Sequence, residues 1–255
     1  MHILLTNDDG VMAPGIKALA GALAPLADKI SVIAPLQEKS ACSQSITVRQ
    51  PLIVENITMA DMPRHIEWIG VDGTPTDCVK LALEALLPEK PDYLISGINR
   101  GPNLGTDVLY SGTVSAAIEG ALYNVRSIAV SSNSWQDEHY ETAAAFVVRF
   151  IRSMEKHTVT PQVFNINVPA LPETELAGHA FTTLGVRLYQ NVFEERMDPR
   201  GRRYYWMGGD IADPVEGNEN TDIAAVGRKM VSITPLQFDL THYDQLNSLL
   251  QWKLE

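Results

Sequence analysis

The sequence predicts an α/β protein in which one three-layer, mostly parallel β-sheet is covered by helices on both faces. Short segments such as "HILL" at residues 2–5 are apolar throughout, which is typical of strands buried on both faces. Strand and helix alternate from residue 2 to about residue 168, the order expected for a three-layer sheet. The chain has 255 residues, a length that suits one large domain or a domain with a subdomain.

The N-terminal part of this pattern is a strand, a helix and a second strand. The first helix is expected within 13–27, because Ile16, Leu19 and Leu23 recur at helical spacing and share one face. The second strand is expected over 29–35. A polar loop, 36–45, follows it. The segments 46–57 and 65–71 then alternate enough between apolar and polar residues to be extended.

The remainder of the core repeats the alternation. An amphipathic helix is expected within 72–91, with Val79, Leu83 and Leu86 on one face and a proline that ends it. After it we expect a strand over 92–99, a long glycine-rich loop over 100–113 and a helix over 114–124. A strand over 127–132, a helix over 141–155 and a strand over 163–169 follow.

The last quarter of the chain predicts a long β-hairpin over 186–209. Its aromatic-rich arms flank the turn signal at 198–201. Tyr204, Tyr205 and Trp206 on an exposed hairpin would form an apolar patch of the kind that marks interfaces, so we expect the hairpin to mediate oligomerisation. The alternative is that the hairpin packs back on the core.

The C-terminal elements are an acidic loop, a short strand and an amphipathic helix, expected over 213–222, 231–236 and 241–254. We therefore divide the chain into a catalytic core, 1–182, and an extension of the same domain used for oligomerisation, 183–255.

The composition limits the classes of partner. A net charge of -11 without a basic run argues against a protein that binds a nucleic-acid polymer, and a small anionic substrate would need a local cation or backbone amides. The sequence has no leader-like N-terminus and no apolar run long enough to span a membrane, so we expect a cytoplasmic protein. Cys42 and Cys78 are too few for a disulfide framework, and the dispersed histidines give little support to a zinc site.

Two adjacent carboxylates, Asp8 and Asp9, directly follow the first strand in "NDDG". The segment has the composition of an ordinary turn, yet ligands of parallel sheets sit beyond the carboxyl ends of the strands. Ser40 and Asn99 follow the second strand and the strand over 92–99, although each is also a common loop residue. Together these oxygen donors suit Mg²⁺, Mn²⁺ or Ca²⁺ better than zinc.

The glycine-rich loop predicts an anion site. Ser111, Gly112 and Thr113 open the next helix, where backbone amides and the helix dipole bind phosphate, although Ser111 or Thr113 would serve equally as a simple N-cap. A metal site beside an anion site indicates phosphate ester hydrolysis, in which a metal polarises the phosphoryl oxygen and lowers the pKa of water.

The chain resembles the SurE family of nucleotidases. The resemblance is carried by successive segments in order: "TNDDG", "EKSACSQSIT", "GTPTDCVKLAL", "SGINRGPNLGTDVLYSGTVSAAIEGA" and "YYWMGG". It implies a Rossmann-like core and a phosphatase, dependent on Mg²⁺ or Mn²⁺ with one ion per subunit, that acts on nucleoside 5'-monophosphates and sometimes on 3'-monophosphates. Short polyphosphate is a further candidate substrate that the sequence leaves open. The resemblance also implies a homodimer or homotetramer in which the hairpin and C-terminal helix exchange between subunits.

The family's functional residues map onto this sequence without departure. The resemblance implies that the metal ligands are Asp8, Asp9, Ser40 and Asn99, and that the phosphate contacts are Asn103, Ser111, Gly112 and Thr113. Asp8 is the candidate catalytic residue, as a ligand, a proton acceptor or both. Attack by metal-activated water is favoured over a covalent intermediate, because the site has no suitably placed histidine or cysteine.

Two other functions are consistent with parts of the pattern. An aspartyl-phosphate phosphatase of the haloacid dehalogenase type also places aspartates after its first strand, but one residue separates them there, whereas Asp8 and Asp9 are adjacent. A non-catalytic, metal-dependent nucleotide sensor would bind the same ligands without turning them over.

Overall fold

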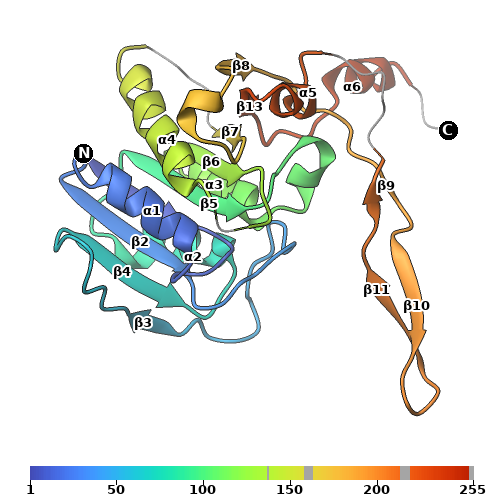
Figure 1. The fold of residues 1–255 in the computed structure, drawn as a ribbon, viewed down its shortest axis with the longest axis horizontal. Helices are drawn as coiled ribbons and strands as arrows, with labels where there is room; N and C mark the ends of the chain where they lie inside the picture. Colours follow the sequence, from blue (N-terminus) through green and yellow to red (C-terminus); the bar gives the residue numbers. More distant parts are fainter. Residues whose placement is uncertain (137, 158–162, 213–218, 253–255) are drawn as a thin grey trace.

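The computed structural model describes residues 1–136, 138–157, 163–212 and 219–252. Within them, a nine-stranded sheet has the order β3-β4-β2-β1-β5-β6-β7-β13-β8 (Figure 1). In that order the strands are Val54–Asn56, Ile66–Val71, Lys29–Pro35, His2–Thr6, Tyr93–Arg100, Arg126–Ser132, Val163–Val168, Val231–Leu236 and His179–Phe181. Pairing is parallel from β4 to β7 and between β13 and β8. Strand β3 runs antiparallel to β4, and β13 runs antiparallel to β7. The expected mostly parallel sheet is confirmed.

Helices cover both faces of this sheet, as the alternating pattern predicted (Figure 1). The first strand shows why: Ile3 and Leu5 belong to one hydrophobic core, and Leu4 between them belongs to the other. Helices α1 (Pro14–Leu23) and α4 (Tyr140–Met154) cover the first core, and α2 (Pro75–Leu81) and α3 (Gly112–Leu122) cover the second.

Side-chain burial confirms the predicted face of α1, since Ile16, Leu19 and Leu23 are fully buried. Two other expectations were only partly right. The α-helix expected to carry Leu83 and Leu86 ends at Leu81 and continues as one π-helical turn, Ala82–Leu86. The extended segment over 46–57 forms only β3.

The carboxyl ends of the parallel strands place several loops at one edge of the sheet. Thr6 at the end of β1 pairs with Ser96 of β5, and Asn99, further along β5, pairs with Ser131 of β6. The loops after β1, β2, β5 and β6 therefore begin side by side, and all of the predicted site residues lie in or next to three of these loops.

The predicted hairpin is present and extends away from the body (Figure 1). Strands β10 (Phe193–Met197) and β11 (Arg203–Met207) pair antiparallel around a turn in which Asp198 N donates to the Arg202 carbonyl at 2.9 Å. Every residue of both strands is exposed. At the base of the hairpin, β9 (Tyr189–Gln190) pairs with β12 (Asp210–Ile211).

The C-terminal segment contributes to the sheet as well as to the surface. The predicted short strand is β13, which lies between β7 and β8, and β8 itself had no counterpart in the sequence pattern. Helix α5 (Asp222–Gly227) precedes β13, and α6 (Tyr243–Leu249) has no buried residue. Of the expected acidic loop, residues 213–218 lie outside the described residues. Short 3₁₀ turns span Gly105–Leu109 and Glu173–Glu175. No helix in the described part of the chain is long and apolar enough to cross a membrane.

Candidate active site

The turn after β1 is made by Asn7 and Gly10. The Asn7 amide donates to the Gly10 carbonyl at 2.8 Å and accepts from Gly10 N at 3.2 Å, and Gly10 has a φ of +105°, which glycine adopts without strain. Because these two residues supply the turn chemistry, the carboxylates of Asp8 and Asp9 are directed elsewhere.

Asp8 connects β1 to the start of α3. Its buried carboxylate accepts a hydrogen bond from Thr113 N at 3.0 Å and another from the Thr113 hydroxyl group. Burial raises the pKa of Asp8, since the charged form loses its hydration. Its own carbonyl accepts from Lys39 N at 2.8 Å, which holds the loop after β2 against this turn.

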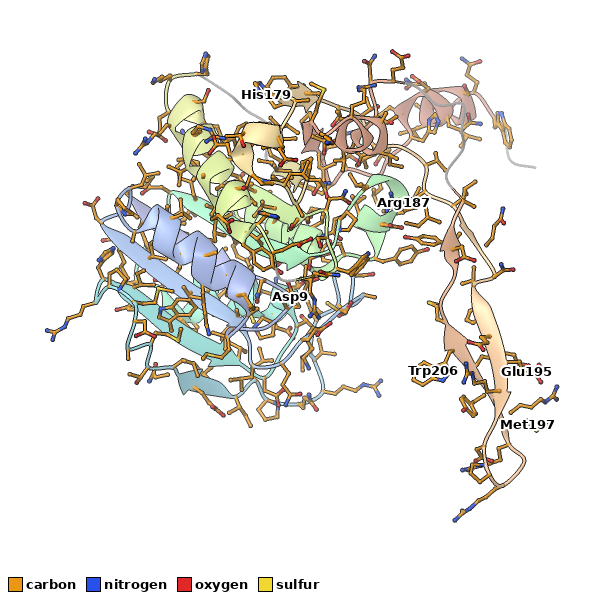
Figure 2. The ribbon with its side chains drawn as sticks, viewed as in Figure 1. Asp9, His179, Arg187, Glu195, Met197 and Trp206 are labelled. Atoms are coloured by element: carbon orange, nitrogen blue, oxygen red, sulfur yellow. The ribbon has the colours of Figure 1, made fainter. Side chains whose placement is uncertain are left out.

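Asp9 connects β1 to β5. Its Oδ2 accepts from Arg100 N at 2.9 Å. Burial, and next the charge of Asp8, raise the pKa of Asp9 to about 7. Figure 2 shows Asp9 in the body of the molecule, well away from Trp206 and Met197 on the hairpin. Because these two adjacent carboxylates are largely removed from water, a cation bound between them would stabilise their charged forms.

The other two predicted ligands lie on the neighbouring loops. The Asn99 amide nitrogen donates to the Gly101 carbonyl at 2.8 Å, an arrangement that fixes the side chain and leaves its oxygen available. Ser40 is exposed and directly follows Lys39, whose backbone is bonded to Asp8. The structure thus brings the segments that carry all four predicted ligands to one edge of the sheet.

This donor set fits a hard divalent cation. In the described part of the chain, no three His, Cys, Asp or Glu side chains gather where they could hold a metal ion, so a site here would also need the oxygens of Ser40 and Asn99. Two carboxylates with a hydroxyl and an amide oxygen are instead the ligands that Mg²⁺ or Mn²⁺ accepts. Burial first, and then the charge of Asp8, raise the pKa of Asp9 to about 7, and a bound cation would offset both effects.

The start of α3, where the anion site is predicted, lies directly against Asp8. Ser111 is a true N-cap, since its Oγ accepts from Val114 N at 3.0 Å. Thr113 directs its N–H and hydroxyl to Asp8. A Cβ on Gly112 would lie 2.8 Å from Cys42 Sγ and 3.0 Å from Asp8 Cβ, so a side chain there would require Cys42 and Asp8 to shift. The two predicted sites are therefore in direct contact, through the hydrogen bonds between Thr113 and Asp8.

Asn103 is buried in a polar network that the sequence reasoning missed. Its Nδ2 donates to Ser131 Oγ at 2.8 Å and its backbone N–H donates to Asn167 Oδ1 at 2.8 Å. Its carbonyl accepts from the amides of Asn165 and Asn167 at 2.8 and 3.0 Å. The available signal was the pair of alternate asparagines in the otherwise apolar strand "VFNINV".

Asp222, also missed, anchors the middle of the same loop. It is fully buried, and its carboxylate accepts from Gly105 N and Gly185 N, both at 2.8 Å. Nearby, Asp107 accepts from Tyr189 OH at 2.6 Å, so the loop also contacts the base of the hairpin. Asp222 is the last residue of the expected acidic loop, 213–222, and nothing in the sequence distinguished it from the other acids there.

Two further acidic side chains accept hydrogen bonds from the loop after β2 and hold it in place. Asp77 accepts from Thr47 N at 2.8 Å and from Thr47 Oγ1 at 2.6 Å. Glu119 on α3 is buried, accepts from the Gln44 amide at 3.1 Å and pairs with Lys80 at 3.0 Å. The segment that carries Ser40 is thus held against both α2 and α3.

Comparison with known proteins gives a consistent result. The family model described as "Survival protein SurE" matches residues 3–191. A protein of Heliobacterium modesticaldum named 5'-nucleotidase SurE is 52% identical over 253 residues, covering 99% of this chain and 92% of its own. Its namesake from Carboxydothermus hydrogenoformans is 52% identical over 256 residues, covering 99% and 96%.

A solved structure extends the likeness to three dimensions. The crystal structure of the SurE protein from Aquifex aeolicus superposes with a TM-score of 0.84 at 37% identity, covering 98% of each chain. The family match spans most of the sequence and includes every predicted site residue. The chain belongs to the SurE family.

Proposed function

We propose that this chain is a divalent-metal-dependent phosphatase that hydrolyses nucleoside 5'-monophosphates. The observation that carries the proposal is the pair of adjacent carboxylates, buried Asp8 and partly buried Asp9, fixed between the start of α3 and the end of β5. Relatives at 52% identity are named 5'-nucleotidase SurE, which gives the substrate class.

In this proposal Asp8, Asp9, Ser40 and Asn99 hold one Mg²⁺ or Mn²⁺ per subunit. When bound, the cation would polarise the phosphoryl oxygen and lower the pKa of water. Asp9 presents its charge while its Oδ2 stays on Arg100 N, and the amide of Asn99 is oriented by Gly101. Asp8 is the proposed proton acceptor, positioned by Thr113.

The phosphate group would lie at the start of α3, near Asn103, Ser111, Gly112 and Thr113. The N-terminus of this eleven-residue helix carries a partial positive charge that favours an anion. In the reaction a water oxygen forms a bond to phosphorus, the ester P–O bond breaks, and the nucleoside hydroxyl leaves with a proton.

We also propose two additional substrate classes and a mode of oligomerisation. We infer that nucleoside 3'-monophosphates and short polyphosphate are additional substrates, and that the chain forms a homodimer or homotetramer through the hairpin and α6. The exposed apolar residues of both elements support this assembly, among them Phe193, Trp206, Met207, Leu246 and Leu249. A cytoplasmic location is likewise retained as a prediction.

The test is phosphate release from AMP with Mn²⁺, compared with a chelator control. Release that requires the metal supports the proposal, whereas metal-dependent AMP binding without release identifies the nucleotide sensor. Stoichiometric trapping by beryllofluoride on an aspartate would indicate an aspartyl-phosphate mechanism and overturn attack by water. A panel of 3'-monophosphates and polyphosphate in the same assay measures the additional activities.

A further inference from the structure

A tryptophan lies next to the candidate site and has no role in the chemistry described above. Trp135 belongs to the segment that follows β6, the strand whose Ser131 and Ser132 pair with Asn99 and Arg100. Asn133 at the start of this segment donates its N–H to the Val168 carbonyl at 2.9 Å, which directs the chain over the edge of the sheet. Trp135 is nevertheless 73% exposed.

The indole of Trp135 packs its flat face on Gly101. A Cβ built on Gly101 would lie 2.6, 2.8 and 2.8 Å from three consecutive atoms of the benzene ring, and such nearly equal distances place Gly101 over the face of the ring. A side chain at position 101 would occupy this space. One face of the indole is thus supported by backbone, and its large exposed fraction leaves the opposite face in water.

Gly101 connects this ring to the candidate site. It has a φ of +104°, and its carbonyl accepts the hydrogen bond that orients Asn99. It stands two residues after the proposed ligand Asn99 and two residues before the proposed phosphate contact Asn103. An aromatic face is therefore held beside the site by the same short loop that forms part of it.

We propose that the free face of Trp135 stacks against the nucleobase of the substrate and makes the enzyme prefer nucleotides to simpler sugar phosphates. The proposal rests on the nucleotidase function proposed above. With the phosphate group at the site, the ribose and base extend outward, and a supported, solvent-exposed indole is a platform on which any base can stack. Such a surface selects for an aromatic ring without selecting a particular base.

Tyr110 is the competing platform. It precedes Ser111 and is 64% exposed, and its carbonyl accepts from Ser43 N at 3.0 Å. Trp135 is favoured because its ring is already supported from behind by Gly101, so that stacking requires less ordering of the side chain.

The experiment compares AMP with ribose 5-phosphate, which has the same phosphate and sugar but no base. Steady-state kcat and KM are measured for the full-length chain, for Trp135→Ala and Trp135→Phe, and for Phe181→Ala as a matched control. Phe181 is 69% exposed and lies on β8 at the far end of the sheet. We expect Trp135→Ala to lower the preference in kcat/KM for AMP over ribose 5-phosphate about tenfold through the KM for AMP, and Trp135→Phe to retain most of it.

An equal loss on both substrates in Trp135→Ala would show a merely structural role, and an unchanged preference would overturn the proposal directly. It would also be overturned if Tyr110→Ala, and not Trp135→Ala, abolished the preference. If the unmodified chain hydrolyses neither substrate, the proposed function fails. Calorimetric Kd values for the same two compounds in the presence of Mn²⁺ then test stacking separately, because only AMP binding should weaken in Trp135→Ala.

Discussion

Thr113 donates both its backbone N–H, at 3.0 Å, and its hydroxyl group to the carboxylate of Asp8. These residues stand 105 positions apart, one after the first strand and the other in the first turn of α3. The bond pair fixes both oxygens of Asp8 and joins the proposed metal ligands to the proposed phosphate contacts. A substitution among the proposed metal ligands should therefore also affect phosphate binding, and a substitution at the start of α3 should affect metal binding.

The first prediction concerns the hydroxyl group of Thr113. Thr113→Val keeps the shape and the backbone bond but removes one donor to a buried carboxylate, so we expect kcat/KM for AMP to fall about tenfold or more. Thr113→Ser keeps the donor and should retain most of the activity. Steady-state assays of both variants check this, and equal activities would show that the hydroxyl group does not matter to the reaction.

The second prediction concerns the charge of Asp9. Asp9→Asn can still accept from Arg100 N through its amide oxygen, so the fold should be preserved. It loses a charged metal ligand, and we expect phosphate release to be abolished. Turnover of AMP with saturating Mn²⁺ is the measurement, with circular dichroism as the control for folding. Unmodified turnover in this variant would refute the metal role of Asp9.

The third prediction follows from the pKa of Asp9, which burial and Asp8 raise to about 7 in the metal-free chain. The unfolded chain has the ordinary value of about 3.9, so between these values the folded state binds more protons. The free energy of unfolding is therefore highest below the ordinary value and falls as pH rises through 7, by an amount on the order of 4 kcal/mol.

Urea unfolding in a chelator, from mildly acidic to mildly alkaline pH, measures this trend. Asp9→Asn should flatten the curve and be more stable than the unmodified chain at the alkaline end, although it is inactive. Stability that rises with pH in the unmodified chain, or identical curves for the two proteins, would mean that Asp9 is not destabilised by its surroundings.

The fourth prediction concerns Gly112. In Gly112→Ala the new Cβ would meet Cys42 Sγ at 2.8 Å and Asp8 Cβ at 3.0 Å, so Asp8 must move. We expect a higher KM for AMP together with weaker Mn²⁺ activation, because the same carboxylate serves both sites. Metal titrations and substrate titrations of one preparation check this. A raised KM with unchanged metal activation would show that the two sites are independent after all.

Much of the fold was predictable because its signals are local. The apolar run at 2–5 and the helical spacing of Ile16, Leu19 and Leu23 each specify an element without reference to distant residues. The position of Asp8 and Asp9 at a strand end followed from the same rule. By contrast, Asn165 on β7 contacts Asn103 of the loop after β5, and neither segment by itself predicts this long-range contact.

The same limit explains the difference at Thr113 and the omission of Asp222. The first turn of a helix predicts free donors, and only the three-dimensional structure shows that Asp8 accepts those of Thr113. Asp222 binds two glycine amides from segments 117 and 37 residues away. Long-range contacts of this kind leave no periodic pattern in one sequence.

The last prediction concerns the hairpin, whose strands are exposed throughout and carry Phe193, Met197 and Trp206 at 62%, 63% and 63% exposure. Glu195, Met197 and Trp206 lie far from the body of the chain in Figure 2, so the hairpin does not pack on its own core. Gly208 N donates to the Val192 carbonyl at 2.9 Å, which means that residues 193–207 can be replaced by a short glycine-rich turn without moving the ends apart.

We expect this deletion to give a smaller assembly, because the exposed aromatic residues lose the partner surface they are proposed to contact. The contact between Tyr189 and Asp107 and all proposed metal ligands are retained, so Mn²⁺ should still raise the melting temperature. Light scattering coupled to size exclusion gives the mass, and Tyr205→Ser with Trp206→Ser in the intact hairpin serves as the matched variant. An unchanged mass in a folded deletion variant would place the subunit contact elsewhere, with α6 the next surface to remove.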